Sequence, residues 1–258
     1  MLTKGVESPW FLNCAKKKDD AVRVRLFCFP FAGGSAASYF PLSRQITGDV
    51  DVFSVQLPGR ATRFNEPCLS NLRSVVDNLT QAIQPFLDKP FVFFGHSMGA
   101  LIAYEVCCAL YHSQQALPQR LMLSACSAPH VKGRDKALHE LPTEEFWQEI
   151  KTINGTPEAV LTNSELLELI EPTLRADFRL VYEWRQQSST SQKPVLPVPF
   201  ELFAGKDDPS VTPSQLQEWA RYTTYSPTLH CLAGDHFFIH ESSAMFSNIL
   251  STSLASIG

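Results

Sequence analysis

The sequence predicts an α/β fold built on a mainly parallel sheet, and two observations support this prediction. First, short apolar segments of strand length alternate along the chain with segments of helical pattern, as in proteins whose parallel sheet is covered by helices. Second, residues 91–94 read FVFF, without any alternation between apolar and polar residues. A strand of this kind is covered on both faces, which is typical of a parallel sheet.

Six segments have the length and apolar character of strands. They are VRLFCF (24–29), VDVFSVQL (50–57), FVFFG (91–95), RLMLSA (120–125), FELFAG (200–205) and TLHCLA (228–233). Helices are expected at about residues 37–47, 71–87, 98–112, 213–223 and 241–255. The alternation of the two kinds of segment is the basis of the predicted fold.

The alternation stops between about residues 130 and 195, where the sequence is helical and amphipathic without strands. LPTEEFWQEI (141–150) and residues 164–184 predict helices there, and SSTSQKPVLPVP (188–199) predicts an extended connector back to the sheet. Such an insertion either adds cover to the core or forms a lid over a site at the strand ends. Its position after the fourth predicted strand favours the lid.

Length and composition predict one domain, residues 1–258, that includes this insertion. The chain has 258 residues, of which 44% are hydrophobic and 19% charged, enough for a substantial core. A formal net charge of −4 does not favour nucleic acid as a partner. No apolar stretch approaches the roughly 18–20 residues that span a bilayer, and the N-terminus lacks the apolar region of a signal peptide. Seven cysteines without a C-x-x-C pair predict neither a disulfide framework nor a zinc site. We therefore expect a cytoplasmic protein that binds no metal and does not enter a membrane.

Gly95-His96-Ser97-Met98-Gly99 fits the G-x-S-x-G pattern and lies between a predicted strand and a predicted helix. The two glycines remove the Cβ atoms that would collide where strand and helix approach. In such a turn the Ser97 hydroxyl stands above the sheet, at the positive end of the following helix. Ser97 is therefore the predicted nucleophile, and it needs a neighbouring base to take its proton.

His236 is the predicted base. It lies in LAGDHFFIH (232–240), after the last predicted strand, where a loop would return over the strand ends. His96 is adjacent to Ser97, but neighbouring side chains on a sharp turn point apart. His230 falls within a strand, and His240 is expected to begin the final helix.

A third group must hold the imidazole in the correct tautomer, and Asp208 and Asp207 compete for this role. The spacing favours Asp208, because it places that residue at the turn after the strand FELFAG (200–205). The order Ser97, Asp208, His236 is that of the α/β-hydrolases. Donors for an oxyanion are expected from the backbone N–H groups of Met98 and of Ala32, which lies in the turn before Gly34. Alone, the glycine pair could bind phosphate, but it lacks the P-loop lysine and the G-x-G-x-x-G spacing.

Several longer motifs carry a resemblance to a known family. They are Ser8-Pro9-Trp10-Phe11, LFCFPFAGGSAASYF (26–40), VQLPGRATRFNEP (55–67), FFGHSMGALIAYEV (93–106), PTLRADFRLVYEW (172–184), FAGKDDPSV (203–211) and LAGDHFFI (232–239). With them the sequence resembles type II thioesterases, the free-standing α/β-hydrolases that accompany nonribosomal peptide and polyketide synthetases. The resemblance implies Ser97 as nucleophile, His236 as base, Asp208 as its orienting group, and a helical lid at about 130–195. It also implies that Ala32 and Met98 supply the oxyanion amides.

The resemblance further implies a monomer without a cofactor, which removes stalled or wrong acyl groups from the phosphopantetheine arm of carrier proteins. The medium-chain fatty acyl thioesterase of mammals belongs to the same group, so the acyl chain length stays open. A small-molecule carboxylesterase is a further alternative that the triad alone permits. A non-catalytic binding protein is disfavoured, because all three triad candidates are present. Arg60, Arg63 and other basic residues near the entrance are hypothesised to meet an acidic carrier protein. The alternative for the two arginines is internal salt bridges that fix the Leu-Pro-Gly-Arg loop.

Overall fold

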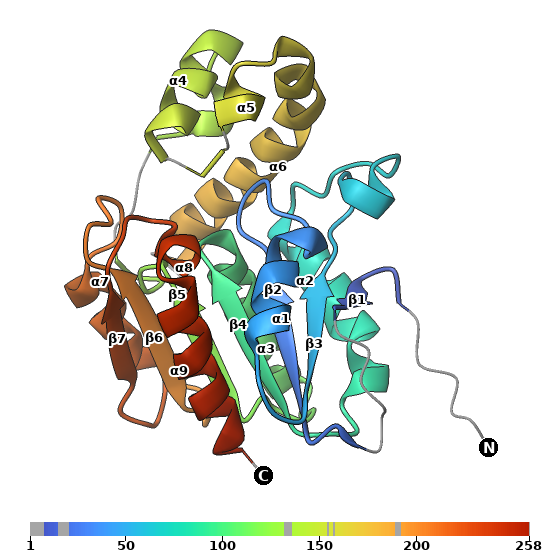
Figure 1. The fold of residues 1–258 in the computed structure, drawn as a ribbon, viewed down its shortest axis with the longest axis vertical. Helices are drawn as coiled ribbons and strands as arrows, with labels where there is room; N and C mark the ends of the chain where they lie inside the picture. Colours follow the sequence, from blue (N-terminus) through green and yellow to red (C-terminus); the bar gives the residue numbers. More distant parts are fainter. Residues whose placement is uncertain are drawn as a thin grey trace.

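The computed structural model describes residues 8–14, 21–131, 136–153, 155–156, 158–188 and 192–257. Within them lies a seven-stranded sheet in the order β1-β3-β2-β4-β5-β6-β7 (Figure 1). The strands are β1 (Phe11–Asn13), β2 (Val24–Phe29), β3 (Val50–Val55), β4 (Phe91–His96), β5 (Arg120–Ser124), β6 (Phe200–Gly205) and β7 (Thr228–Leu232). β1 pairs antiparallel with β3, and the other neighbouring strands pair in parallel. The predicted mainly parallel sheet is confirmed.

The six predicted strands are all present, and β1 is the one strand of this sheet that was not predicted. This strand has three residues, too few to show a periodic pattern, and it lies at the edge of the sheet with Phe11 opposite Val55. Its pairing partner lies far along the chain, so local sequence gives no signal for it.

The helices cover both faces of the sheet. They are α1 (Phe40–Gln45), α2 (Leu72–Ala82), α3 (Met98–His112), α7 (Pro213–Gln217), α8 (Phe238–Glu241) and α9 (Ser243–Ala255). Some predicted helices are divided. The segment 71–87 ends as an α-helix at Ala82 and continues as the 3-10 turn Gln84–Phe86, because Pro85 has no N–H to extend the helix.

Strand β4 explains the unbroken apolar run in the sequence. Phe91 and Phe93 pack in the apolar layer that includes residues of α2 and α3, whereas Val92 and Phe94 pack in the opposite layer with residues of α9. All four side chains are buried. Because successive side chains of a strand point to opposite faces, a strand covered on both faces must be apolar at every position.

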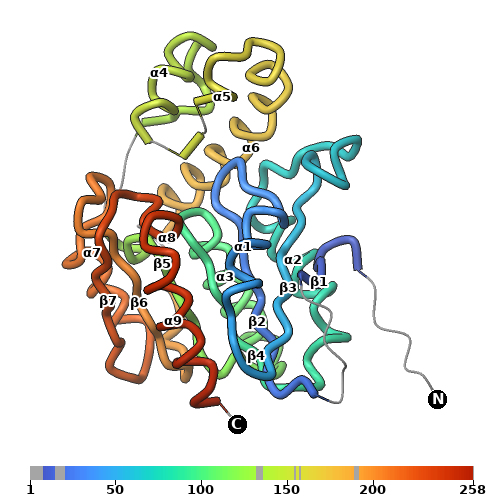
Figure 2. Tube along the Cα trace, viewed as in Figure 1, coloured from blue at the N-terminus to red at the C-terminus, as the bar shows by residue number. Residues whose placement is uncertain are grey.

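The insertion between β5 and β6 forms a separate helical layer. It contains η5 (Leu138–Glu140), α4 (Thr143–Ile153), α5 (Glu158–Leu161) and α6 (Ser164–Ser188). Figures 1 and 2 show α4 and α5 beyond the end of the sheet, with α6 running back toward the body. Five buried side chains form a small core of its own: Leu138, Phe146, Trp147, Ile150 and Leu174. Parts of the predicted segment 130–195, residues 132–135 and 189–191 among them, lie outside the described residues. In the part of the chain that the structure describes, no helix combines the length and apolarity that a membrane span requires.

Candidate active site

The turn from β4 into α3 places Ser97 at the carboxyl edge of the sheet. Ser97 has φ 53° and ψ −118°, a left-handed conformation that is costly for a residue with a Cβ. A Cβ on Gly95 would lie 2.2 Å from the carbonyl oxygen of Gly99, and one on Gly99 would lie 2.0 Å from that of Phe29. Only glycine fits at either position, which is why the turn can be this sharp. The Ser97 N–H also donates to the carbonyl of Ser124 at 2.8 Å.

His236 lies in the loop between β7 and α8 and reaches back to this serine. Its Nε2 is 3.0 Å from Ser97 Oγ, and its Nδ1 is 2.8 Å from Asp208 Oδ2. If Nδ1 carries the proton and donates it to the carboxylate, Nε2 is free to accept the serine proton. The geometry therefore suits nucleophilic catalysis by an activated hydroxyl.

Asp208, and not Asp207, lies against this imidazole. The side chain of Asp208 has 0% exposure, and its Oδ1 accepts hydrogen bonds from the backbone N–H groups of Ser210 and Val211 at 2.7 and 3.3 Å. Asp207 is exposed, and it pairs with Gly234 in the loop that carries His236. Asp207 thus supports the histidine loop, while Asp208 contacts the histidine itself.

The two predicted oxyanion residues, Ala32 and Met98, line the same pocket as Ser97 and His236. Among the described residues, neither backbone amide donates a hydrogen bond to another group of the protein. Met98 is the first residue of α3, where helix N–H groups have no partner inside the helix and the helix dipole favours negative charge. Both amides are thus available to an anionic ligand atom in the pocket.

The pocket has a volume of about 160 Å³ and lies between the strand ends and the insertion. Its apolar lining from the insertion includes Leu138, Ile150, Ile153, Leu174, Phe178 and Val181. On the other side, the rings of Phe31 and Phe237 meet edge to face with centroids 5.1 Å apart. A pocket of this kind suits an apolar chain whose reactive end lies at Ser97.

The other histidines near the turn do not compete for the serine. His96 is fully buried, and its Nδ1 lies 2.8 Å from Ser124 Oγ. Burial lowers the pKa of His96 well below its ordinary value near 6.5, and His236 and His240 lower it further. His96 is therefore neutral over the physiological range. Among the described residues, no group of three or more His, Cys, Asp and Glu side chains is placed to hold a metal ion.

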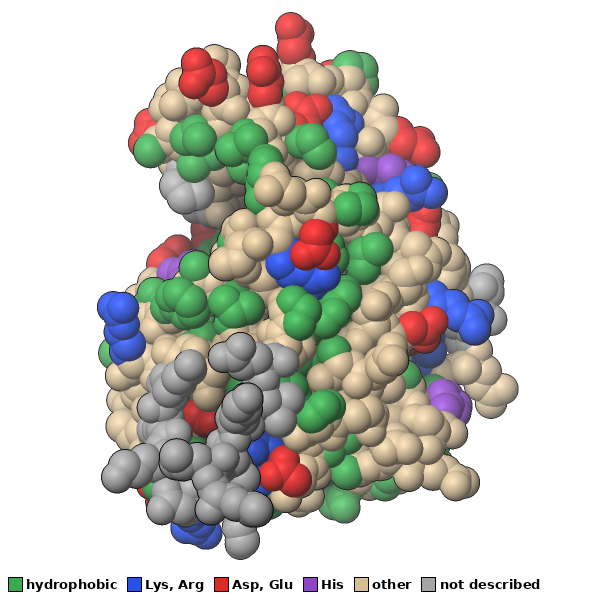
Figure 3. All heavy atoms as spheres, turned by 90° about the vertical axis from the view of Figure 1, so that its right-hand side faces the viewer, with side chains coloured by type: hydrophobic (Ala, Val, Ile, Leu, Met, Phe, Trp, Pro, Cys, Tyr) green, Lys and Arg blue, Asp and Glu red, His purple; other side chains and the backbone are tan. Residues whose placement is uncertain are grey.

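Arg60 and Arg63 are internal, so the hypothesis that they form an exposed docking surface is wrong. Arg60 is 6% exposed and pairs with Asp177 in α6. Arg63 is 8% exposed, binds Glu66 through two nitrogen atoms, and lies over the ring of Trp10 at 4.1 Å. The alternative, internal ion pairs that fix the Leu-Pro-Gly-Arg loop, is confirmed. Figure 3 shows acidic side chains on the outer surface of the insertion, where Glu144, Glu145, Glu165 and Glu168 are exposed.

Asp177 is a residue of this region for which no role is predicted from the sequence. It lies on the buried side of α6, together with Leu174, Leu180 and Trp184. An acidic residue on an otherwise apolar helix face needs a buried partner. The position of Asp177 on the apolar face of a predicted helix is therefore the sequence signal that could have identified it.

The fold and the site define the class of protein. A mainly parallel sheet, a strained serine turn after a central strand, and Ser97, Asp208 and His236 brought together in that chain order are the features of a serine α/β-hydrolase.

The chain belongs to the thioesterase family. The model of the family's thioesterase domain matches residues 24–256. Over 233 residues the chain is 36% identical to the gramicidin S biosynthesis protein GrsT of Aneurinibacillus migulanus, covering 90% of this chain and 89% of GrsT. It is also 31% identical to the medium-chain S-acyl fatty acid synthase thioesterase of Rattus norvegicus, covering 88% and 86% of the two chains.

Comparison with a solved structure supports the same family. The type II thioesterase BorB from the borrelidin biosynthetic cluster superimposes with a TM-score of 0.82 at 30% identity, covering 96% of this chain and 99% of BorB. The resemblance to type II thioesterases is therefore confirmed, and the protein is a hydrolase that acts on thioesters.

Proposed function

We propose that the protein is an editing thioesterase, which removes acyl groups from the phosphopantetheine arm of carrier proteins in nonribosomal peptide or polyketide biosynthesis. The observation that carries the proposal is the 3.0 Å contact between Ser97 Oγ and His236 Nε2 at the base of an apolar pocket. The likeness to GrsT and BorB supports the pathway. We further propose that the enzyme acts as a monomer without a cofactor. The seven free cysteines fit a reducing cytoplasm.

The proposed reaction has two stages. In the first, His236 takes the Ser97 proton as Oγ attacks the thioester carbonyl, and the amides of Ala32 and Met98 donate to the oxyanion. The tetrahedral intermediate then collapses, and the pantetheine sulfur leaves with the proton held by His236. In the second stage, His236 takes a proton from the water molecule that attacks the acyl-enzyme carbonyl. The second tetrahedral intermediate collapses as its bond to Ser97 Oγ breaks, His236 returns the proton to Oγ, and the acid is released. Asp208 stabilises the imidazolium in both stages.

The insertion, about residues 130–195, is proposed to act as a lid. Its side chains supply much of the apolar lining above Ser97, so a bound acyl chain would lie between the insertion and the strand ends. Exclusion of bulk water there strengthens the interactions of the oxyanion with its donors. Carrier proteins are usually acidic, so the acidic outer surface of the insertion would repel them. We therefore expect docking elsewhere.

The experiment that tests the proposal follows intact masses of defined acyl-carrier proteins incubated with the wild type and with Ser97→Ala. We expect the wild type to convert acyl-carrier to free carrier protein. Ser97→Ala should be slower by at least about 10³-fold with unchanged folding, because removal of a triad nucleophile leaves only residual catalysis. Undiminished turnover by Ser97→Ala would refute the assignment of the nucleophile.

A fatty acyl thioesterase is the second candidate function, favoured by the 31% identity to the medium-chain enzyme of Rattus norvegicus. A series of carrier proteins with acyl chains of increasing length separates the two candidates, since an editing enzyme should accept short chains. A p-nitrophenyl ester of matched chain length tests the esterase alternative. A higher kcat/KM for that ester than for the acyl-carrier protein would favour the esterase.

A further inference from the structure

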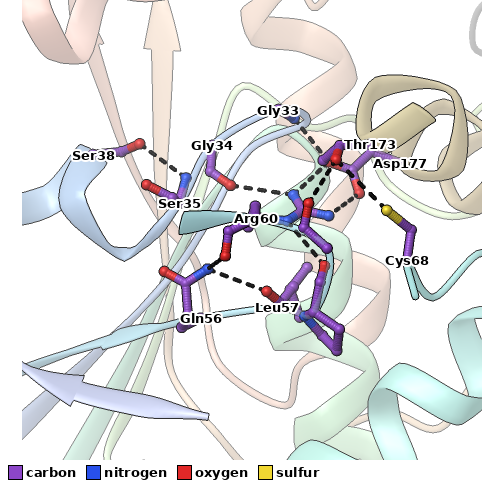
Figure 4. A network of polar contacts seen from close by, with 12 residues as sticks. Gly33, Gly34, Ser35, Ser38, Gln56, Leu57, Arg60, Cys68, Thr173 and Asp177 are labelled. Atoms are coloured by element: carbon purple, nitrogen blue, oxygen red, sulfur yellow. Dashed lines mark hydrogen bonds and ion pairs between the residues drawn. The ribbon is translucent and has the colours of Figure 1, made fainter. Parts of the chain in front are cut away.

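A buried ion pair joins Asp177 in α6 of the insertion to Arg60 in the loop after β3, and both residues also bind the loop after β2 (Figure 4). Asp177 has 0% side-chain exposure, and its two oxygens accept hydrogen bonds from the two terminal nitrogens of Arg60, each at 2.7 Å. Its Oδ2 also accepts from the backbone N–H of Gly33 at 2.8 Å. Arg60 in turn donates to the carbonyl of Gly34 at 3.2 Å. Burial by itself lowers the pKa of Arg60, but the Asp177 carboxylate raises it, and the net shift is upward. Arg60 therefore keeps its charge despite its burial.

Residues 31–34, which we call the oxyanion turn, are the target of this pair. The N–H of Gly34 donates to the carbonyl of Phe31 at 2.8 Å, and Gly33 has φ +75°, as at the third position of a type II turn. The orientation of the peptide between Ala32 and Gly33 distinguishes this turn from a type I turn. The Gly33 N–H belongs to that peptide. Its hydrogen bond to Asp177 therefore opposes the rotation of the peptide that would convert the turn to type I.

Packing of α6 against the oxyanion turn also holds that turn in place, as the hydrogen bond from Gly33 to Asp177 does. A Cβ on Gly33 would lie 2.7 Å from Leu174 Cδ2, so α6 lies directly against the turn. One turn of helix before Asp177, the hydroxyl of Thr173 donates to the carbonyl of Gly59 at 2.9 Å. The middle of α6 is thus fastened both to the oxyanion turn and to the Leu-Pro-Gly-Arg loop.

We propose that Arg60 and Asp177 are positioning residues that hold the oxyanion turn, and with it the Ala32 amide, in the geometry that stabilises the transition state. The inference rests on the proposed function of that amide. An ion pair of this kind is costly to bury and is often replaceable by apolar residues without loss of stability. Stability alone is therefore a poor reason for its presence, whereas preorganisation of an oxyanion donor is a specific benefit.

The test compares Asp177→Asn and Arg60→Gln with Arg63→Gln. Arg63 is a matched control, because it lies in the same loop, is equally buried and pairs with Glu66 without contacting the oxyanion turn. For each variant we would measure kcat and KM with an acyl-pantetheine substrate and unfolding by urea. We would also measure the affinity for two pantetheine analogues of the same chain length: a trifluoromethyl ketone, which forms a tetrahedral adduct, and a thioether, which cannot.

Asp177→Asn and Arg60→Gln should each lower kcat by about 10- to 100-fold, comparable to weakening one oxyanion donor. The affinity for the ketone should fall in parallel, while KM and the affinity for the thioether change by less than about twofold. Arg63→Gln should lower stability only. If Arg60→Gln fails to fold, Arg60→Lys keeps the charge without the two-pronged geometry, and it should show a smaller loss with the same pattern.

Two outcomes would overturn the inference. One is a loss of turnover that matches only the fraction of unfolded protein; the other is an equal weakening of ketone and thioether. Ser97→Ala separates this failure from failure of the proposed function. If that variant is inactive while Asp177→Asn behaves as wild type, only the positioning inference is lost. If Ser97→Ala is active, the proposed site itself is wrong.

Discussion

Replacement of Asp208 by Asn is expected to inactivate the enzyme through the tautomer of His236. Oδ1 of Asp208 accepts two backbone hydrogen bonds, from Ser210 and Val211, while Oδ2 faces His236 Nδ1 at 2.8 Å. In the variant, the amide oxygen must take the Oδ1 position, because the two backbone N–H groups need an acceptor. The amide NH₂ then faces Nδ1 and donates to it.

That arrangement moves the imidazole proton to Nε2, where it points at Ser97 Oγ and prevents the histidine from accepting the serine proton. A change of this kind in another serine hydrolase lowers kcat by about 10⁴-fold, which corresponds to about 5.5 kcal/mol of transition-state stabilisation. We expect a loss of this order here. The free energy of unfolding should change little, because every buried hydrogen bond keeps a partner.

The assay is the release of free thiol from an acyl-pantetheine, measured as kcat/KM, with Asp207→Asn as the control. Asp207 carries the same charge one position earlier, but it is exposed and contacts Gly234 rather than the imidazole. Asp207→Asn should therefore retain turnover within about tenfold of wild type, since it only loosens the histidine loop. A greater loss in Asp207→Asn than in Asp208→Asn would refute this account and move the orienting role to Asp207.

Three further predictions follow from the packing. Gly99→Ala should lower the free energy of unfolding by about 3 kcal/mol or more in urea titrations, because the new Cβ would lie 2.0 Å from the Phe29 carbonyl oxygen; a neutral effect would show that the backbone can yield. Burial lowers the pKa of His96, so the native state binds fewer protons there than the unfolded chain. Stability should then fall as the pH drops from about 7.5 to about 5.5, and it should fall less in His96→Gln. Iodoacetamide should modify exposed Cys231 first, as measured by peptide mass mapping. It should spare Cys28 and Cys107 in the native protein, since burial raises the pKa of both thiols well above 9.0; equal labelling would contradict the structure.

Much of the fold could be predicted because its signals are local. The apolar run of β4, the helical pattern of α3 and the glycines between them lie within residues 91–112, so periodicity and turn chemistry suffice to identify them. The same holds for the helical insertion, whose amphipathic pattern differs from that of the sheet. β1 has no such signal, because its three residues form a strand only by pairing with β3.

The site divides in the same way. Chain order and the ends of predicted strands single out Ser97 and His236 and narrow the third residue to two adjacent aspartates. Asp207 and Asp208 have the same chemistry and nearly the same position in the sequence. The choice between them depends on which carboxylate the turn after β6 directs inward, and backbone hydrogen bonds to Asp208 decide it.

The sequence alone predicted the class of fold and the serine turn, because both depend on neighbours along the chain. Chain order and the end of the last predicted strand also singled out His236, which lies against Ser97. Only the tertiary structure decided that Arg60 and Arg63 are internal, and that Asp177 reaches a backbone N–H 144 residues away. The physical reason is that burial and ion pairing depend on distances between segments remote in sequence. The pattern of the sequence shows which residues share one face of a helix or strand. It does not show which other segment of the chain packs against that face.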